Sequence, residues 1–406
     1  MTWIARIPLS LESGEVGRTG FCDNLFGFCT KQQSRGLPGT ISRLLDQAMT
    51  ISRIQDRPTE RREFLRTTTF TCAGFALAGG MGQSAWATAG RRDPRWIEAT
   101  NKGLQWLARN QSSRGQWNAQ VYPTAMAALA GTALLASGST TTQGPYAREI
   151  ARATDFLISK SRPNGLIGDP QSDSRYTYGH GFAMLFLSQV LGEEGLLERR
   201  NELVDVLTRA VEFSGNAQTP AGGWGYVSAR EGSNFDEGST TITQVQGLRG
   251  CRNAGIAVPS EIIERAKEYI YICKNADGGI SYSSKQTGSS RPAITAAALA
   301  ALYNAGDYDS EHVPDMWRYA KETLHNINDA ARAFGHWHYT YLYYSQVVYR
   351  KGDELWLDFR QKLYDRIVAD QRPDGYWEGQ IHPVYVTACN LTMLQLDRGF
   401  LPIYQR

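Results

Sequence analysis

One unit of secondary structure recurs six times between residues 95 and 406, and this repeat limits the fold more than any other feature. Each unit has a charged amphipathic segment, then a glycine-rich turn that ends in an aromatic or β-branched residue, then a segment of small and apolar residues. The residues that end the turns are 40 to 57 positions apart: Trp117, Ile167, Trp224, Ile280, Trp337 and Trp377. Such recurrence indicates one supersecondary element per unit, stacked on its neighbours.

The two segments of each unit differ in charge, and this difference predicts which one is buried. The charged segments are 95–111, 146–160, 197–218, 260–275, 313–333 and 353–371. The segments with almost no charge are 124–137, 179–191, 239–253, 293–304, 338–350 and 384–396. A helix with a polar stripe lies at the surface, whereas a helix that is apolar all round is buried. The sequence therefore predicts an all-α fold, a single (α/α)6 toroid of six helix hairpins that forms one domain over residues 88–406.

The first 87 residues have the pattern of an export signal. The pair Arg61-Arg62 with Phe64 and Leu65 precedes a weakly apolar run, 67–82, and the small-residue exit Ala85-Trp86-Ala87 follows. These regions describe a secretory signal, and the arginine pair resembles the twin-arginine type. The run is shorter and more polar than the ~20 residues that a membrane anchor needs. We expect residues 49–87 to be a signal peptide cleaved after about Ala87, which places the protein in the periplasm or cell envelope.

Residues 1–48 precede this signal and show no periodicity, so we interpret them as a mis-assigned start or a disordered extension, with Met49 as the true start. The net charge of the chain, +3, lies entirely within residues 1–87. The remaining residues are balanced, which gives no electrostatic footprint for nucleic acid. No stretch after Ala87 approaches a membrane span. Only Cys251, Cys273 and Cys389 remain there, and this odd number implies no disulfide framework.

Three of the turns share the spacing Q-x-x-x-G-x-W, and a weaker copy stands at Gly278-Gly279-Ile280. The full copies are Gln111/Gly115/Trp117, Gln218/Gly222/Trp224 and Gln371/Gly375/Trp377. This unit resembles the QW-type repeat of the prenyltransferase and squalene-cyclase superfamily, and the final residues Leu401–Arg406 resemble those of secreted bacterial prenyltransferase-like proteins. The resemblance implies an isoprenoid ligand, or a similar small hydrophobic molecule, in an aromatic-lined central cavity. It also implies that the Gln and Trp residues are structural.

The catalytic signatures of that superfamily are absent from the sequence. There is no D-x-D-D acid motif, and Asp236-Glu237 is the nearest candidate. The last inner segment reads Val384-Tyr-Val-Thr-Ala-Cys389, without the His that completes the zinc site of protein prenyltransferases. The thioester motif G-C-G-E-Q is also missing. We therefore expect no cofactor, with zinc as the alternative.

All inner helices should start at the same mouth of the ring, because the chain enters each one from a glycine-rich turn. Their N-termini then direct partial positive charge to one opening. Asp236, Glu237 and His180 lie near these starts and are the candidate catalytic residues. The two acids suit proton transfer or, equally, offset the helix dipole. Three roles are open for the histidines. They cap turns, or they act as general acid–base groups. The third role is a zinc site, formed by His180, by either His336 or His338, and by His382.

Aromatic and histidine side chains near the same starts are the candidate substrate-binding residues: Tyr178, His336, Trp337, His338, Tyr341, His382 and Tyr385. The fifth inner segment is the most aromatic. In it Tyr341 and Tyr344 fall at helical spacing, while Tyr339 and Tyr343 lie on a neighbouring face. Such a stripe packs in the core or lines a cavity that stabilises a cation.

Three functions remain open at this stage. The leading hypothesis is an exported isoprenoid-binding protein, whose chemistry, if it is an enzyme, is cyclisation or prenyl transfer through a carbocation. The first rival is a non-catalytic binding or scaffold protein of the envelope. The second is a polysaccharide hydrolase or lyase, which would place two carboxylates ~5–10 Å apart across a cleft. Fold resemblance alone does not decide between them.

Overall fold

The computed structural model describes residues 92–119, 121–232, 234–327 and 336–405. The predicted extension 1–48, the signal peptide 49–87 and its cleavage after about Ala87 lie outside the described residues. Within these ranges the secondary structure is twelve α-helices, two short 3₁₀-helices and three isolated β-bridges, with no strand. The all-α prediction is confirmed.

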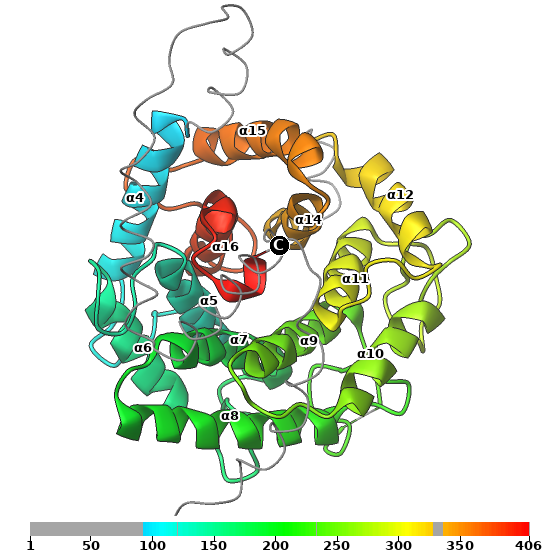
Figure 1. The fold of residues 1–406 in the computed structure, drawn as a ribbon, viewed down its shortest axis with the longest axis horizontal. Coiled ribbons are helices and arrows are strands. Elements are labelled where there is room, and N and C mark those ends of the chain that lie inside the picture. The colour runs from blue at the N-terminus through cyan, green and yellow to red at the C-terminus, as the bar shows by residue number, and fades with distance from the viewer. Residues whose placement is uncertain (1–91, 120, 233, 328–335, 406) are drawn as a thin grey trace, which may run out of the picture. The chain divides into compact units, whose positions relative to one another are not determined.

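The helices form two concentric layers (Figure 1). The outer helices are α4 (Pro94–Arg109), α6 (Ala147–Ser159), α8 (Leu197–Ala217), α10 (Ser260–Ile272), α12 (Val313–Leu324) and α15 (Asp353–Ala369). The inner helices are α5 (Pro123–Leu135), α7 (Tyr176–Glu193), α9 (Gly238–Asn253), α11 (Pro292–Ala305), α14 (Trp337–Arg350) and α16 (Pro383–Gln395). Each inner helix contacts the next, and α16 contacts α5, so the inner layer is a closed ring.

Burial follows the charge pattern of the sequence. Every residue of α5 from Thr124 to Leu135 is buried, whereas α10 buries only Ala266, Tyr269 and Ile270. The predicted α/α toroid is therefore confirmed, including its alternation of outer and inner helices. The largest difference in boundaries is at the fifth outer helix, which ends at Leu324 and not at 333. Asn326 follows the end of this helix, and asparagine favours helix ends because its side chain competes for the backbone.

The glycine-rich turns fasten each repeat to the next one. The Gln218 amide donates to the carbonyl oxygen of Gly222 (2.7 Å) and to that of Ile262 on α10 (2.9 Å), while the Trp224 indole N–H donates to the Ser214 carbonyl (2.8 Å). Gln111 and Gln371 make the same bonds, and Gln371 reaches Ala99 on α4 (2.8 Å). The last repeat is thereby tied to the first, which closes the outer layer.

The end of the chain fills the ring at the C-terminal ends of the inner helices. The short helix η2 (Pro402–Tyr404) contacts α9, and Figure 1 shows the C-terminus near the middle of the ring. The Ile403 carbonyl accepts from Arg350 (2.7 Å), and Tyr404 is 5% exposed. Gln246 on α9 also donates to Gln346 on α14 (2.6 Å), two helices that α11 separates in the ring. The ring is therefore closed at this end.

Candidate functional site

The centre of the candidate site is Glu237, the N-cap residue of α9. Its carboxylate is fully buried and accepts hydrogen bonds from the Tyr178 hydroxyl (2.9 Å), the Ser239 backbone N–H (2.9 Å), the Ser239 hydroxyl (2.6 Å) and the Thr240 hydroxyl. A carboxylate at this place satisfies free N–H groups of the first turn and offsets the helix dipole. Glu237 thus caps α9 while joining it to Tyr178 on α7.

Three further tyrosines from two other inner helices share this region. Burial raises the pKa of Tyr339 well above its ordinary value, and the neighbouring Tyr343, Tyr178, Glu237 and Tyr385 raise it further. Burial also raises the pKa of Tyr385, with added contributions from Cys389, Tyr343 and Tyr178. These mutual effects place the groups within electrostatic reach of one another. Helices α7, α9, α14 and α16 therefore converge on one tyrosine cluster, which we define as Tyr178, Tyr339, Tyr343 and Tyr385.

The cluster is accessible on its outer side and closed beneath. Tyr178, Tyr339 and Tyr385 are each partly exposed, whereas Tyr343, one turn further along α14, is fully buried. The hydroxyls of Tyr339 and Tyr343 are buried and make no hydrogen bond to a described residue. A buried hydroxyl without a partner costs free energy, so these two groups stand ready for a ligand or water.

Two arginines lie at the rim of the same mouth. Arg175, which precedes α7, stacks over the Tyr226 ring at 4.2 Å, and Arg291, which precedes α11, stacks over the Tyr282 ring at 4.4 Å. The hydroxyls of Tyr226 and Tyr282 are hydrogen-bonded to each other. Both arginines are exposed, and among the described residues neither forms an ion pair. Two exposed positive charges therefore lie at the starts of α7 and α11.

Unusual backbone conformations occur on the remaining side of the mouth. Within the described ranges, the non-glycine residues with positive φ are Tyr122 (56°), His336 (54°) and Ile381 (79°). They immediately precede α5, α14 and the N-cap of α16, three helices that are neighbours in the ring. Such conformations cost about 1–3 kcal/mol each and cluster at functional sites. The strain is thus concentrated at the mouth.

The predicted acids Asp236 and Glu237 are adjacent in sequence but bond to different parts of the molecule. Asp236 is fully buried and accepts from the Ser283 hydroxyl (2.9 Å) and from the backbone N–H (2.8 Å) and hydroxyl (2.6 Å) of Ser284. It fixes the loop before α11 and does not contact the tyrosine cluster. The two carboxylates therefore do not face each other across a cleft.

His180 is fully buried between α7 and the outer layer. Its Nδ1 accepts from the Ile167 backbone N–H (3.1 Å), and its Nε2 lies 3.2 Å from both the Ala210 carbonyl and the Ser214 hydroxyl. Burial lowers the pKa of His180 to about 4. These contacts give it a structural role, so its prediction as a catalytic residue gains no support from the geometry.

The other predicted histidines occupy the mouth without converging. His336 is exposed at the N-cap of α14, and His338 pairs its Nδ1 with Asn390 Oδ1 (3.0 Å). His382 caps α16 by accepting from the Val384 backbone N–H (3.2 Å). Within the described part of the chain, no group of three His, Cys, Asp or Glu side chains is arranged to hold a metal ion. The alternative of a zinc site therefore gains no support from the placement of His180, His336, His338 and His382.

Tyr341 of α14 is a predicted substrate-binding residue, but its side chain lies toward the outer layer. Tyr341 points outward, where its hydroxyl donates to the Leu324 carbonyl (3.1 Å) and its ring packs on Phe359 and on Trp337. Tyr339 and Tyr343, whose rings are 4.8 Å apart, lie on the other face of α14 and belong to the tyrosine cluster. Both faces carry tyrosines at helical spacing, so periodicity alone could not identify the inner one. The rim residues Arg175, Arg291 and Tyr226 were not among the predicted site residues, although both arginines lie directly before an inner helix.

The described helices form an α/α toroid, and solved structures of a terpene cyclase share this fold. The apo structure of the type II terpene cyclase MstE from Scytonema matches with a TM-score of 0.52 and 15% identity, over 76% of this chain and 99% of that one. The same enzyme with geranylgeranyl dihydroxybenzoate, its substrate, matches with a TM-score of 0.51 and 14% identity, over 78% and 100%. Its complex with the product merosterolic acid A matches with a TM-score of 0.52 and 14% identity, over 79% of this chain and 100% of that one.

This likeness is one of structure, and at such identities it establishes the fold alone. The sequence itself matches no protein-family model and no curated protein. In the described ranges, no helix is both long and apolar enough to cross a membrane. The three cysteines there, Cys251, Cys273 and Cys389, are buried and unpaired with one another.

Proposed function

We propose that this protein binds an isoprenoid or a similar hydrophobic ligand at the N-terminal mouth of its helical ring, as a terpenoid cyclase-like protein. The tyrosine cluster is the observation that supports this most, because three inner helices contribute its rings, Glu237 of a fourth is hydrogen-bonded to it, and its outer side is accessible. Aromatic rings pack well on a branched apolar chain, and their faces attract cations. The fold neighbour MstE has been solved with a geranylgeranyl-bearing substrate, which makes a prenyl chain a reasonable ligand class.

The rim suggests how such a ligand would be oriented. Arg175 and Arg291 carry positive charge at the opening without an ion-pair partner among the described residues. A ligand with an apolar tail and a polar or anionic head would place its head there and its tail among Tyr178, Tyr339 and Tyr385. Tyr343 and the closed far end would limit the depth that the tail can reach.

Carbocation chemistry, either cyclisation or prenyl transfer, is the finer part of the proposal. Cyclisation of a polyene is redox-neutral, because a proton added to one alkene carbon is later lost from another. Glu237, joined to Tyr178, is the acid nearest to the cluster. Both of its oxygens act as acceptors, so proton donation from Glu237 requires one of the bonded hydroxyls to turn. This full set of acceptor contacts favours the rival reading, a binding protein without catalysis.

The two readings separate in one set of assays on the purified full-length chain. Binding of geranylgeraniol is measured by tryptophan and tyrosine fluorescence, and products of incubation with geranylgeranyl dihydroxybenzoate are examined by mass spectrometry. We expect Tyr339→Leu to weaken binding at least tenfold, whereas Tyr341→Leu, on the outer face of the same helix, leaves binding unchanged once folding is verified by thermal unfolding. Equal affinities for both variants would refute the site.

Glu237→Gln then tests catalysis separately from binding. If Glu237 is the acid, the wild type forms a cyclised product and Glu237→Gln forms none while still binding the ligand. A wild type that binds but never forms product supports the non-catalytic reading. No observation favours a polysaccharide substrate, because Asp236 and Glu237 diverge.

Export through a twin-arginine-type signal is part of the same proposal, and it rests on the sequence of residues 49–87 alone. The mature protein would then meet its ligand in the periplasm or cell envelope. Amino-terminal sequencing of the protein from its host tests this directly: a start near residue 88 supports export, and an intact Arg61-Arg62 pair in the purified protein contradicts it.

A further inference from the structure

A second candidate site lies in the outer layer, between α12 and α15. The tyrosine cluster, in contrast, belongs to the inner layer. It is an open groove with a volume of about 630 Å³, walled by Trp317, Arg318, Lys321 and Glu322 of α12, by His325 and by Lys362 of α15. This volume lies within the range of about 300–1,000 Å³ that small-molecule sites occupy.

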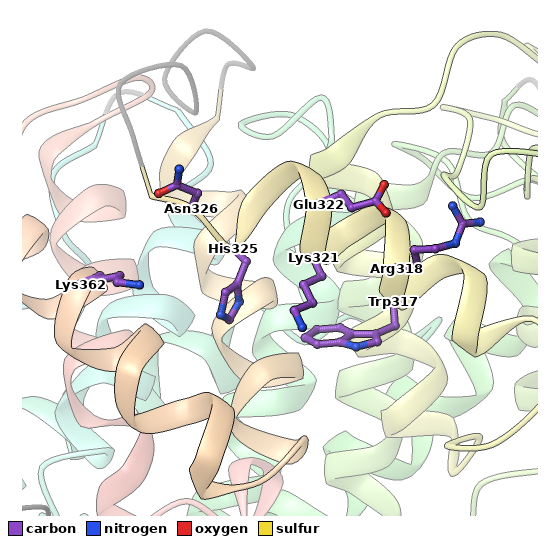
Figure 2. A pocket seen from close by; sticks show the side chains of 7 residues that line it. All are labelled: Trp317, Arg318, Lys321, Glu322, His325, Asn326 and Lys362. Carbon is purple, nitrogen blue, oxygen red and sulfur yellow. The ribbon is translucent and has the colours of Figure 1, made fainter.

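Positive charges gather around His325 in this groove. Figure 2 shows the imidazole of His325 between Lys362 on one side and Lys321 on the other. Lys362 is paired with Asp358 (2.7 Å) and Arg318 with Asp315 (3.2 Å), whereas Lys321 makes no ion pair with any described residue. Glu322 is directed away from the two lysines in Figure 2. The groove thus holds one cation without a counter-ion beside a histidine and a second, paired cation.

The position of His325 is fixed from below. Its Nδ1 lies 3.1 Å from the Tyr344 hydroxyl of α14, and its ring stacks on Phe359 of α15 at 5.2 Å. Burial lowers the pKa of His325, the charges of Lys321 and Lys362 lower it further, and Asp358 acts in the opposite direction. An anion placed between the lysines would reverse the effect of their charges, because an opposite charge favours the protonated imidazole.

Trp317 supplies a flat apolar wall at the same place. The indole also contacts the Tyr344 ring, which stacks on it at 6.2 Å, and the Lys351 ammonium at 5.5 Å. The ring is half-buried, so it also borders the groove. A planar group entering the groove would pack on this wall with favourable apolar burial.

We propose that the α12–α15 groove is a separate binding site for a small organic anion attached to a planar ring. Lys321 and Lys362 would hold the anionic group over His325, which gains a proton as the anion binds, and Trp317 would pack against the ring. The site is independent of the isoprenoid proposal, since it shares no residue with the tyrosine cluster.

Phenyl phosphate is the probe, with inorganic phosphate and phenol as its two halves, and the full-length chain is titrated while the His325 ring resonances are followed by NMR. The resonances are assigned with His325→Gln. We expect phenyl phosphate to bind at least tenfold more tightly than either half and to raise the pKa of His325. Lys321→Gln should weaken binding about tenfold, whereas Lys102→Gln, an exposed lysine of α4, should leave it unchanged.

Trp317→Leu separates the two parts of the site: it should weaken phenyl phosphate binding and leave the weaker inorganic phosphate binding intact. The proposal is overturned if saturating phenyl phosphate leaves the His325 pKa unmoved, or if Lys321→Gln and Lys102→Gln bind the probe equally. It is also overturned if phenyl phosphate binds no more tightly than inorganic phosphate, because the ring then contributes nothing.

Discussion

The two ends of the inner ring are built from the same six helices and differ in almost every other respect. At the N-terminal mouth, the first turns expose part of Tyr178, Tyr339 and Tyr385 around the buried Glu237. At the opposite end, Tyr404 and the bonded pair Gln246 and Gln346 are all at most 5% exposed. The two ends differ because the chain enters every inner helix at the mouth, while the C-terminal segment packs against the helices at the other end.

The connections also differ in how tightly they are held. Turns on the mouth side are fixed by Gln and Trp side chains and by glycines packed against the next outer helix. On the other side, Gly255 and Gly306 end α9 and α11 with open space around them. Gly255 and Gly306 are therefore less tightly packed than the turn glycines on the mouth side.

The largest expected effect compares one glycine from each end of α9. Gly222 has φ +97°, and a Cβ there would overlap the carbonyl oxygen of Arg265. Gly255 has φ +89° but no heavy atom within 4 Å of such a Cβ. Gly222→Ala should therefore lower the free energy of unfolding by about 4 kcal/mol or more, and Gly255→Ala by about 1 kcal/mol, the cost of a left-handed alanine. Urea unfolding of both variants measures the difference. Equal losses in the free energy of unfolding would contradict the tighter packing of the turn that contains Gly222.

The next effect removes the closure of the far end. Tyr404→Ala should lower the free energy of unfolding by about 3–5 kcal/mol, because it leaves a cavity where a large buried ring stood. Tyr308→Ala is the control, since Tyr308 is 45% exposed and its loss should cost less than about 0.5 kcal/mol. Calorimetric unfolding compares the two. A loss for Tyr404→Ala as small as that of the control would mean that the C-terminal segment does not seal the ring.

The sequence predicted the ring itself well, because charged and uncharged helices alternate along the chain. The charge of a helix directly determines whether it lies in the outer or the inner layer. The sequence also predicted that Tyr178, Glu237 and Tyr385 lie at the same mouth. These residues are at the starts of inner helices, and the topology places all of those starts at one end of the ring. It could not tell that Asp236 turns toward Ser283 and Ser284 while Glu237 turns inward, because neighbouring residues in an extended segment point in opposite directions.

The inner face of α14 was equally out of reach of the sequence. Both faces of this helix are aromatic and buried, one against α15 and one against the centre of the ring. The hydrophobic pattern therefore cannot show which face points to the centre. The C-terminal closure was not anticipated either. Its residues show no helical period, and their role depends on where the ring happens to bring the chain end.

The two faces of α14 give a smaller and more specific contrast. Tyr341→Phe removes a hydroxyl that donates to the Leu324 carbonyl, so we expect a loss of about 1 kcal/mol in the free energy of unfolding. Tyr339→Phe removes a buried hydroxyl without a partner among the described residues, so stability should stay equal or rise slightly. Chemical denaturation of both variants tests the assignment of the faces, and the reverse order would place Tyr339 outside the cluster.

The smallest net effect should be the dependence of stability on pH between 4 and 6, because two buried groups near the mouth oppose each other. Burial lowers the pKa of His180 to about 4, so the unfolded chain binds the extra proton in this range and stability rises with pH. Burial raises the pKa of Asp173 to about 6, so the folded chain binds the extra proton and stability falls with pH. Each group alone corresponds to about 3 kcal/mol over its full range.

Single variants should therefore reveal slopes of opposite sign that the wild type hides. Stability of His180→Gln should fall as the pH rises from 4 to 6, since only the Asp173 effect remains, and stability of Asp173→Asn should rise over the same range. Urea unfolding at half-unit pH steps measures both slopes, whatever the absolute stability of each variant. Parallel slopes in the two variants would show that burial does not hold both groups in their neutral forms over this range. The structural role of His180, outside the tyrosine cluster, would then have to be abandoned.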